Sequence, residues 1–219
     1  MSINNQNHIC SDIMEHQPEI NEQKKNQQQH IHHHHHHHAG MSSKVFLDAK
    51  YVLEQFGELL GKTIVDIGCG DGHFSVAASE LVGDSGKIYS MDVDEPSIIS
   101  LNNKIKQKGT QNITTMLADF TKGVEIETES VDISLMVNVF HGFVINGEEK
   151  QVINEIKRLL KNTGELIIVE FKKKSNTPGP KYDERLAADE LENIIGEYGF
   201  KKEKTFEVGQ LHYAIVFSK

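Results

Sequence analysis

Cysteine is scarce in this sequence, and long apolar runs do not occur in it. Two cysteines, Cys10 and Cys69, cannot build a disulfide framework, and no metal-ligand spacing accompanies Cys69. No segment approaches the roughly 20 apolar residues that span a bilayer. The N-terminal segment also lacks the apolar region of a signal peptide. We therefore expect a soluble cytoplasmic protein that has no metal site and does not bind a membrane.

The first 40 residues differ in composition from the rest of the chain. They are rich in Asn, Gln and His, and they hold ten of the 13 histidines, including the run from His32 to His38. Such a segment has too few large apolar side chains to bury a core. We interpret residues 1–40 as a disordered leader or expression tag, the alternative being a native metal-binding tract. The folded domain is expected at residues 41–219, where Met41 resembles a second start.

The predicted domain is acidic. The chain has 32 acidic and 23 basic residues, and removal of four acids and two lysines with the leader leaves 28 and 21, a net charge of −7. This balance argues against the phosphate backbone of a nucleic acid as the main partner. A small-molecule substrate is expected instead, and the oligomeric state is left open.

Apolar periodicity alternates between strand-like and helix-like segments along the domain. Strands are expected at residues 64–67, 87–91, 113–117, 130–137, 165–171, 201–208 and 212–217. Helices are expected at residues 45–60, 74–82, 96–108, 148–160 and 187–198. This order is typical of a parallel sheet with helices on both faces. Only residues 209–211 separate the last two strands, so these two must be antiparallel.

A glycine-rich loop joins the first strand to the helix that begins near His73. Gly68, Gly70 and Gly72 allow a sharp turn that leaves backbone N–H groups open at the positive end of that helix. An anion or a polar nucleotide fits such a loop. A dinucleotide-binding fingerprint is disfavoured, because its third glycine would fall on His73.

With Asp66 two residues before the glycine run, the loop resembles motif I of the class I S-adenosylmethionine-dependent methyltransferases. Seven strands that end in a hairpin are similar to the topology of that family, and the resemblance covers residues 41–219. It implies an α/β, Rossmann-like fold: a seven-stranded, mostly parallel sheet with an antiparallel last strand and helices on both faces. It also implies that Asp66, Gly68, Gly70 and Gly72 hold the amino-acid end of S-adenosyl-L-methionine.

Polar residues at the ends of the second and third strands extend this predicted cofactor site. Ligands of open α/β sheets bind beyond the carboxyl ends of the strands, where the Asp92 carboxylate can accept hydrogen bonds from both ribose hydroxyls. Asp92 by itself would serve NAD equally well. The resemblance implies that Asp119 accepts from the adenine amino group, that the Phe120 N–H contacts the ring and that Val93 packs on it.

The end of the fourth strand is where methyl donor and acceptor meet in the resembling family. Asn138 lies there and is expected to contact the cofactor. The absence of the Pro-Pro that follows this position in enzymes acting on nucleic-acid amines disfavours an adenine or cytosine acceptor. His141, Glu170 and His212 are the catalytic candidates, since the ends of the fourth and fifth strands share one sheet edge with the start of the antiparallel seventh. A histidine there could remove a proton from the acceptor. The alternatives are that both histidines are structural and that Glu170 orients a loop.

Two further segments have open interpretations. His73 is expected to cap the first helix or to flank the cofactor. The lysines at 172–174, followed by Pro178-Gly179-Pro180-Lys181, form a basic segment that is either a solvated face or a loop closing over an anionic substrate.

The sequence therefore predicts a methyltransferase that uses S-adenosylmethionine and is nearest to the ubiquinone-biosynthesis and arsenite methyltransferase-like group. Arsenite is not expected as the substrate, because Cys69 is the one cysteine of the domain. The acceptor is expected to be a small molecule, and a protein side chain stays open. The alternatives are an NAD-dependent oxidoreductase and a non-catalytic nucleotide-binding partner protein.

Overall fold

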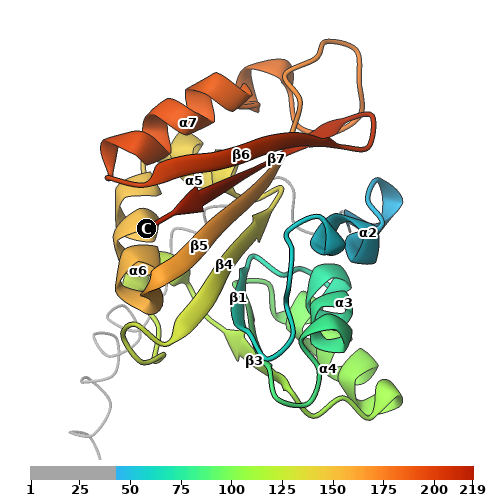
Figure 1. Ribbon diagram of the computed structural model, residues 1–219. Coiled ribbons are helices and arrows are strands. Elements are labelled where there is room, and N and C mark those ends of the chain that lie inside the picture. Colours follow the sequence, from blue (N-terminus) through green and yellow to red (C-terminus); the bar gives the residue numbers. More distant parts are fainter. Residues whose placement is uncertain (1–42) are drawn as a thin grey trace, which may run out of the picture. The chain divides into compact units, whose positions relative to one another are not determined.

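The computed structural model describes residues 43–219, and the predicted leader at 1–40 lies outside the described residues. These residues form a seven-stranded sheet with the strand order β3-β2-β1-β4-β5-β7-β6 (Figure 1). The strands are β1 (Thr63–Ile67), β2 (Lys87–Asp92), β3 (Ile113–Leu117), β4 (Val131–Val137), β5 (Leu160–Phe171), β6 (Lys201–Val208) and β7 (His212–Ser218). The strand order reverses between β1 and β4, which makes the carboxyl ends of these two strands the expected ligand-binding crevice.

The last strand in sequence, β7, is antiparallel to both of its neighbours, β5 and β6. Its register with β5 pairs Phe171 with His212, so the start of β7 lies beside the end of β5. The left-handed φ of +70° at Gly209 allows the short turn from β6. The predicted mostly parallel sheet with a terminal antiparallel strand is therefore confirmed.

Helices cover both faces of the sheet, as predicted (Figure 1). The helices are α2 (Ala49–Glu54), α3 (His73–Val82), α4 (Glu95–Lys108), α5 (Phe140–Asn146), α6 (Glu149–Leu159) and α7 (Ala188–Glu197), with single 3-10 turns η1 (Ser43–Val45), η2 (Phe120–Lys122) and η3 (Tyr182–Glu184). Buried residues of α2 and α3 pack on one face, and those of α5, α6 and α7 pack on the other. Among residues 43–219, no helix is both long and apolar enough to cross a membrane.

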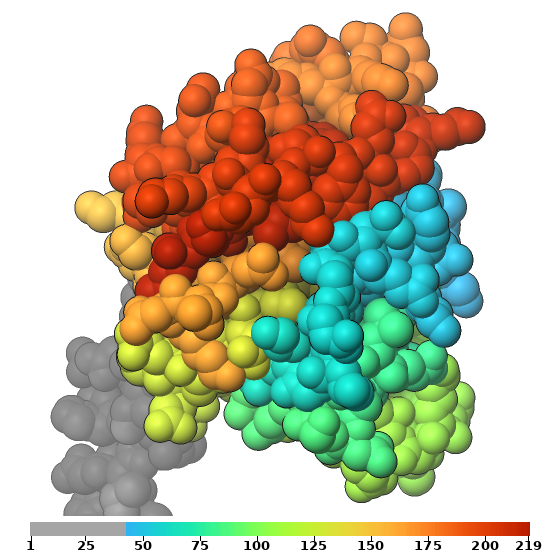
Figure 2. Space-filling model, in the orientation of Figure 1, coloured from blue at the N-terminus to red at the C-terminus, as the bar shows by residue number. Residues whose placement is uncertain are grey.

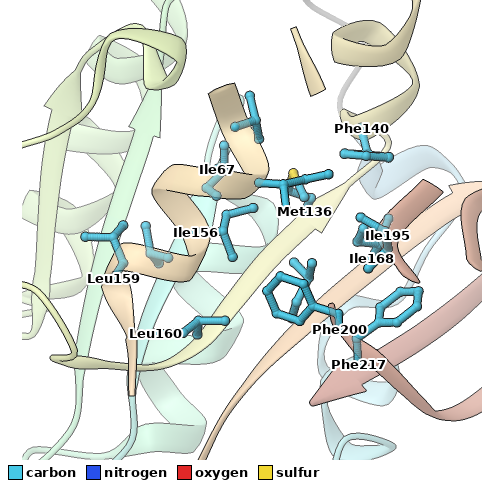
Figure 3. Close-up of a cluster of buried hydrophobic side chains, with 14 of the residues drawn as sticks. Ile67, Met136, Phe140, Ile156, Leu159, Leu160, Ile168, Ile195, Phe200 and Phe217 are labelled. Carbon is cyan, nitrogen blue, oxygen red and sulfur yellow. The ribbon is translucent and has the colours of Figure 1, made fainter. Parts of the chain in front are cut away.

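Strand residues alternate between the two apolar layers, which explains why the central strands read as continuous apolar runs. In β5, Ile168 faces the layer that includes Phe140 and Ile156, drawn in Figure 3, whereas the neighbouring Ile167 faces the layer of α2 and α3. A parallel sheet buried on both faces requires apolar side chains at successive positions.

The predicted helix at 45–60 is wrong in its extent. The helix α2 has only six residues, begins after the N-cap Asp48 and ends at Glu54. Gly57 has a φ of +99°, which no helix residue adopts, and Val45 and Leu60 are 76% and 65% exposed. The apolar spacing continued past both ends of the helix because other residues in those flanks are buried without being helical.

Two further features depart from the sequence prediction by more than one residue. The helix α5 is not predicted from the sequence, because its seven residues include Gly142 and several β-branched or aromatic side chains of modest helix propensity. The strand β5 begins at Leu160 rather than at 165, with a register shift against β4 between Val131 and Ile133. Tertiary packing determines both features.

Residues 46–56, which include α2, contact the C-terminal hairpin of β6 and β7, and the two lie next to each other in blue and red in Figure 2. The Lys204 Nζ donates to the Gln55 backbone oxygen at 2.8 Å, and the Phe56 and Phe206 rings lie 5.7 Å apart. Phe46, just before α2, lies 6.1 Å from the His212 ring. The first described residues are thereby held at the sheet edge where β7 begins.

Candidate cofactor site and acceptor pocket

The glycine loop between β1 and α3 has the conformation that its sequence predicts. Gly68, Gly70 and Gly72 have φ values of +69°, +53° and +80°, in the left-handed region that disfavours side chains. A Cβ at Gly72 would lie 2.2 Å from a Leu101 methyl, and one at Gly68 would lie 2.6 Å from a Val139 methyl. A Cβ at Gly70 would meet no atom within 4 Å, so this glycine faces open space. Gly68 and Gly72 thus allow close packing, while Gly70 borders open space.

Asp92 fixes this loop from the end of the neighbouring strand β2. The Gly70 N–H donates to Asp92 Oδ2 at 2.8 Å, and the Asp94 N–H donates to Asp92 Oδ1 at 2.9 Å. Each carboxylate oxygen can accept a second hydrogen bond, so ribose hydroxyls can still bind there. The sequence suggested a ligand contact for Asp92 and gave no sign that it also positions the loop.

Asp66 lies beneath the loop and is only 2% exposed. Its Oδ2 accepts a hydrogen bond from Ser75 Oγ at 2.5 Å. Burial raises the pKa of the Asp66 carboxyl to about 7, the Ser75 hydrogen bond opposes this rise, and the nearby Asp92 charge adds to it. Near neutral pH, this carboxyl can therefore gain or lose its proton.

The predicted adenine-binding residues follow β2 and β3. The Val93 side chain is 52% exposed, whereas the Phe120 side chain is buried in the core. The Asp119 Oδ1 accepts from the Thr121 N–H and hydroxyl, and its Oδ2 lies 3.0 Å from Lys122 Nζ. Partial burial by itself would raise the pKa of Asp119, but these contacts with Thr121 and Lys122 lower it below its ordinary value. Asp119 is thus ionised, and it also caps η2.

Asn138, which the sequence predicts to contact the cofactor, lies directly after β4. It has a left-handed φ of +59°, and its N–H donates to the Val169 oxygen at 2.8 Å. Its side-chain Oδ1 is buried and has no hydrogen-bond partner within the described part of the chain. A pocket opens beside it, lined by Ser43, Phe46, Asn138, His141, Phe171, Gly179 and Pro180.

His141 lines this pocket and is paired with Glu170, and the side chains of both are buried. The His141 Nδ1 lies 3.0 and 2.9 Å from the two Glu170 oxygens, and the His141 backbone N–H donates to Oε1 at 3.0 Å. Burial lowers the pKa of the His141 imidazole, but the Glu170 carboxylate raises it more, so it lies above the ordinary value. This contact assigns a proton to Nδ1 and the ring's lone pair to Nε2.

His212 packs against the Phe171 ring and is not among the residues that line the pocket. It is 1% exposed, and neither ring nitrogen has a hydrogen-bond partner among residues 43–219. Its ring lies 4.0 Å from the Phe171 ring. Burial lowers the pKa of His212 to about 4, with Glu170 opposing and Lys172 adding to the shift, so the ring is neutral at pH 7. The pocket includes His141, while His212 lies behind two of its walls.

Two other residues have roles that the sequence analysis did not assign. The His73 Nε2 lies 2.9 Å from the Leu47 oxygen, so His73 ties α3 to the N-terminal segment rather than capping a helix. Arg185 is 3% exposed and donates hydrogen bonds to backbone oxygens of the loop at 172–180. The sequence around Arg185 does not indicate this role, because the acceptors of Arg185 are all backbone or hydroxyl oxygens that folding brings together.

An open α/β sheet with this glycine loop at its switch point, and with a carboxylate at the end of the neighbouring strand β2, defines a domain that binds a nucleotide-type cofactor. Comparison with known proteins supports this interpretation of the site. Residues 58–207 match a family described as a methyltransferase domain. The chain belongs to this family, within the class I S-adenosylmethionine-dependent methyltransferases.

Individual relatives support this assignment. A demethylmenaquinone methyltransferase of Lactococcus lactis is 29% identical over 54% of this chain and 45% of its own length. A ribosomal protein L11 methyltransferase of Streptococcus pneumoniae is 31% identical over 49% of this chain and 31% of its own. The chain thus spans less than half of these curated relatives. The crystal structure of an S-adenosylmethionine-dependent methyltransferase from Aquifex aeolicus superimposes with a TM-score of 0.74 at 26% identity, over 81% of this chain and 93% of the other.

The residues present fit S-adenosylmethionine. Gly70 leaves open space at the loop, the Asp92 oxygens retain acceptor capacity, and Val93 presents an exposed apolar surface. Together they match the needs of a backbone contact, a ribose and an adenine ring. The cofactor expected from the family is thus one that these three residues can accommodate.

Asp66 should make the stability of the domain depend on pH. The folded state keeps the Asp66 proton up to about pH 7, whereas the unfolded state loses it near pH 4. The free energy of unfolding should therefore fall as the pH rises from 4 to 7, by up to about 4 kcal/mol from this residue. Asp66→Asn should remove that component, as measured by urea denaturation at a series of pH values. Parallel pH profiles for the two proteins would contradict the assignment.

His212 should reduce the stability of the fold, because its two ring nitrogens are buried without partners. Leucine has a similar volume, so His212→Leu should raise the free energy of unfolding at pH 7 by roughly 1–3 kcal/mol. The variant should also lose less stability between pH 6.5 and 4, where the unfolded histidine gains a proton and the folded one stays neutral. Urea denaturation at pH 7 and pH 5 measures both effects. A variant that is less stable at pH 7 would contradict the first effect, and an unchanged loss of stability between pH 7 and pH 5 would contradict the second.

Proposed function

We propose that the protein transfers a methyl group from S-adenosylmethionine to a small-molecule acceptor in the pocket beside Asn138. The observation that carries this proposal is the closeness of the glycine loop to the residue that follows Asn138. The Gly68 backbone packs directly against the Val139 side chain, one residue after Asn138. Cofactor loop and pocket are therefore neighbours at the switch point between β1 and β4.

The glycine loop and the strand ends would hold the cofactor. Asp66, Gly68, Gly70 and Gly72 would contact its amino-acid end, and Asp92 would bind the ribose. The adenine would lie against Val93, near Asp119 and the Phe120 N–H. When bound, S-adenosylmethionine supplies a methyl group on a positively charged sulfur, whose bond to carbon breaks as the acceptor's lone pair attacks.

His141 would act as the general base. A hydroxyl or protonated amine acceptor must lose a proton as it is methylated, and a well-placed base accelerates such steps by about 10²–10⁴-fold. Glu170 would hold the His141 Nδ1 proton and so direct the Nε2 lone pair to the pocket. His212, packed behind Phe171, would keep that wall of the pocket uncharged.

The cytoplasmic location and the small-molecule acceptor predicted from the sequence also belong to this proposal. The acidic charge of the domain supports a small acceptor over a nucleic acid. The proposal does not extend to the acceptors of the two curated relatives, because this chain spans less than half of each.

S-adenosylhomocysteine should bind this protein, and NAD should not. Asp92→Ala should weaken S-adenosylhomocysteine binding by roughly tenfold to a hundredfold, since it removes a charged hydrogen-bond acceptor and releases the Gly70 N–H. Isothermal titration calorimetry measures both quantities. Asp84→Ala, at a turn remote from the loop, serves as the control. Unchanged affinity in Asp92→Ala would show that the cofactor lies elsewhere.

The methyl-transfer rate should fall in acid as His141 gains a proton. Glu170→Gln removes the charge that raises the His141 pKa, so the acidic limb of the pH–rate profile should move to lower pH. His141→Gln should lower kcat by about 10²–10⁴-fold without loss of S-adenosylhomocysteine affinity. Transfer of a radiolabelled methyl group to fractionated cell-extract metabolites first identifies an acceptor and then gives the profile. An acidic limb that stays in place in Glu170→Gln would exclude His141 as the base.

A further inference from the structure

We propose that the methyl acceptor is an uncharged molecule with an apolar body and a hydrogen-bond donor at the end that reaches Asn138. This inference rests on the proposed function and names the chemical class of its substrate. It follows from three features of the pocket: its walls, the state of the cations around it and one unpartnered oxygen.

The walls of the pocket are largely apolar. The Phe46 and Phe171 rings meet edge to face, with centroids 5.5 Å apart. Gly179 packs so closely on Phe171 that an added Cβ would lie 2.7 Å from the ring, and the buried Pro180 continues this wall. An apolar ligand surface gains free energy by contacting such walls, whereas a charge loses hydration there.

Arg185 is the buried cation next to this wall, and all of its side-chain N–H groups donate to acceptors within the protein. Its guanidinium carbon lies 5.5 Å from the Phe171 ring centroid. The five N–H groups of the side chain donate to the backbone oxygens of Lys172, Lys174, Thr177, Pro178 and Pro180 and to the Thr177 hydroxyl. These six contacts leave no N–H of Arg185 for a ligand carboxylate or phosphate.

The lysines of the same loop do not supply a counter-ion either. The Lys172 Nζ lies 3.0 Å from Glu207 Oε1, and the Lys173 Nζ lies 2.9 Å from Glu190 Oε1. Lys174 is exposed, so water screens its charge. An anion in the pocket would lie near Glu170, and to pair with Lys172 or Lys173 it would have to break an existing ion pair. The alternative that this loop closes over an anionic substrate is therefore disfavoured.

A cationic acceptor is disfavoured by the same pocket. Glu170 is the buried carboxylate beside it, and both Glu170 oxygens already contact His141. An ammonium group would lose its hydration without gaining a carboxylate of its own.

Asn138 requires a donor from the ligand. Its Oδ1 is buried next to the pocket and lacks a partner within residues 43–219. Such an orphaned acceptor costs about 1–3 kcal/mol, which a ligand hydroxyl or amine N–H would recover. The left-handed φ of Asn138 and its backbone hydrogen bond to Val169 place the Cα from which this side chain extends beside the pocket.

Four probes with one benzene ring test the proposal: benzyl alcohol, benzyl methyl ether, benzoate and benzylamine. Their binding to the full-length protein, saturated with S-adenosylhomocysteine, is measured by ligand-observed NMR at millimolar concentration. Benzyl alcohol, which is neutral and a donor, should bind at least roughly tenfold more tightly than each of the others.

A matched pair of variants assigns the preference to Asn138. Asn138→Gly keeps a residue suited to the left-handed backbone and removes Oδ1, so the advantage of benzyl alcohol over its methyl ether should disappear. Asn176→Gly alters an exposed asparagine with nearly the same φ, +57°, and should leave that advantage unchanged.

Equal or tighter binding of benzoate or benzylamine would overturn the proposal, and so would an alcohol-to-ether ratio that Asn138→Gly leaves unchanged. Failure of all four probes to bind a protein that does bind S-adenosylhomocysteine would also overturn it. If S-adenosylhomocysteine itself does not bind, the proposed function fails, so calorimetry with that ligand alone distinguishes the two failures.

Discussion

The hydrogen bond from the Gly70 N–H to the Asp92 carboxylate is the constraint on which the site depends. This hydrogen bond joins the loop after β1 to the end of β2, so the carboxyl ends of these two adjacent parallel strands are held in place relative to each other. With the loop in this position, Gly68 packs on Val139 and Gly72 packs on Leu101. The conformation that exposes Gly70 to a ligand is therefore set by the same contacts that pack the core around it.

Buried polar groups concentrate around this edge of the sheet. Asp66, the His141 and Glu170 pair and His212 are all nearly inaccessible to water. Burial of such groups lowers stability unless each finds a partner, and His212 and the Asn138 oxygen have none within the described chain. Of these two residues, Asn138 lines the pocket, so its unpartnered oxygen lies next to a space that a ligand can occupy.

Much of the fold followed from local rules. Alternating strand and helix patterns, the glycine spacing and the three-residue link before β7 indicated the parallel sheet and its antiparallel end before any contact was known. The helix α2 and the missed helix α5 show the limit of these rules. Apolar spacing around α2 reflects burial of a non-helical chain, and α5 forms despite modest propensity because Phe140 packs into the core. Both outcomes depend on residues distant in sequence.

By itself, the sequence determined the fold class, the glycine loop and the carboxylates at the strand ends, because each rests on spacing along the chain or on backbone conformation. Only the tertiary structure decided that His141 pairs with Glu170 and that His212 packs on Phe171. It also decided that the N–H groups of Arg185 all donate hydrogen bonds to the loop at 172–180. These relations depend on burial and on contacts between separate strands and loops. Charge and hydrogen-bonding state are properties of such environments, and residue type alone does not specify them.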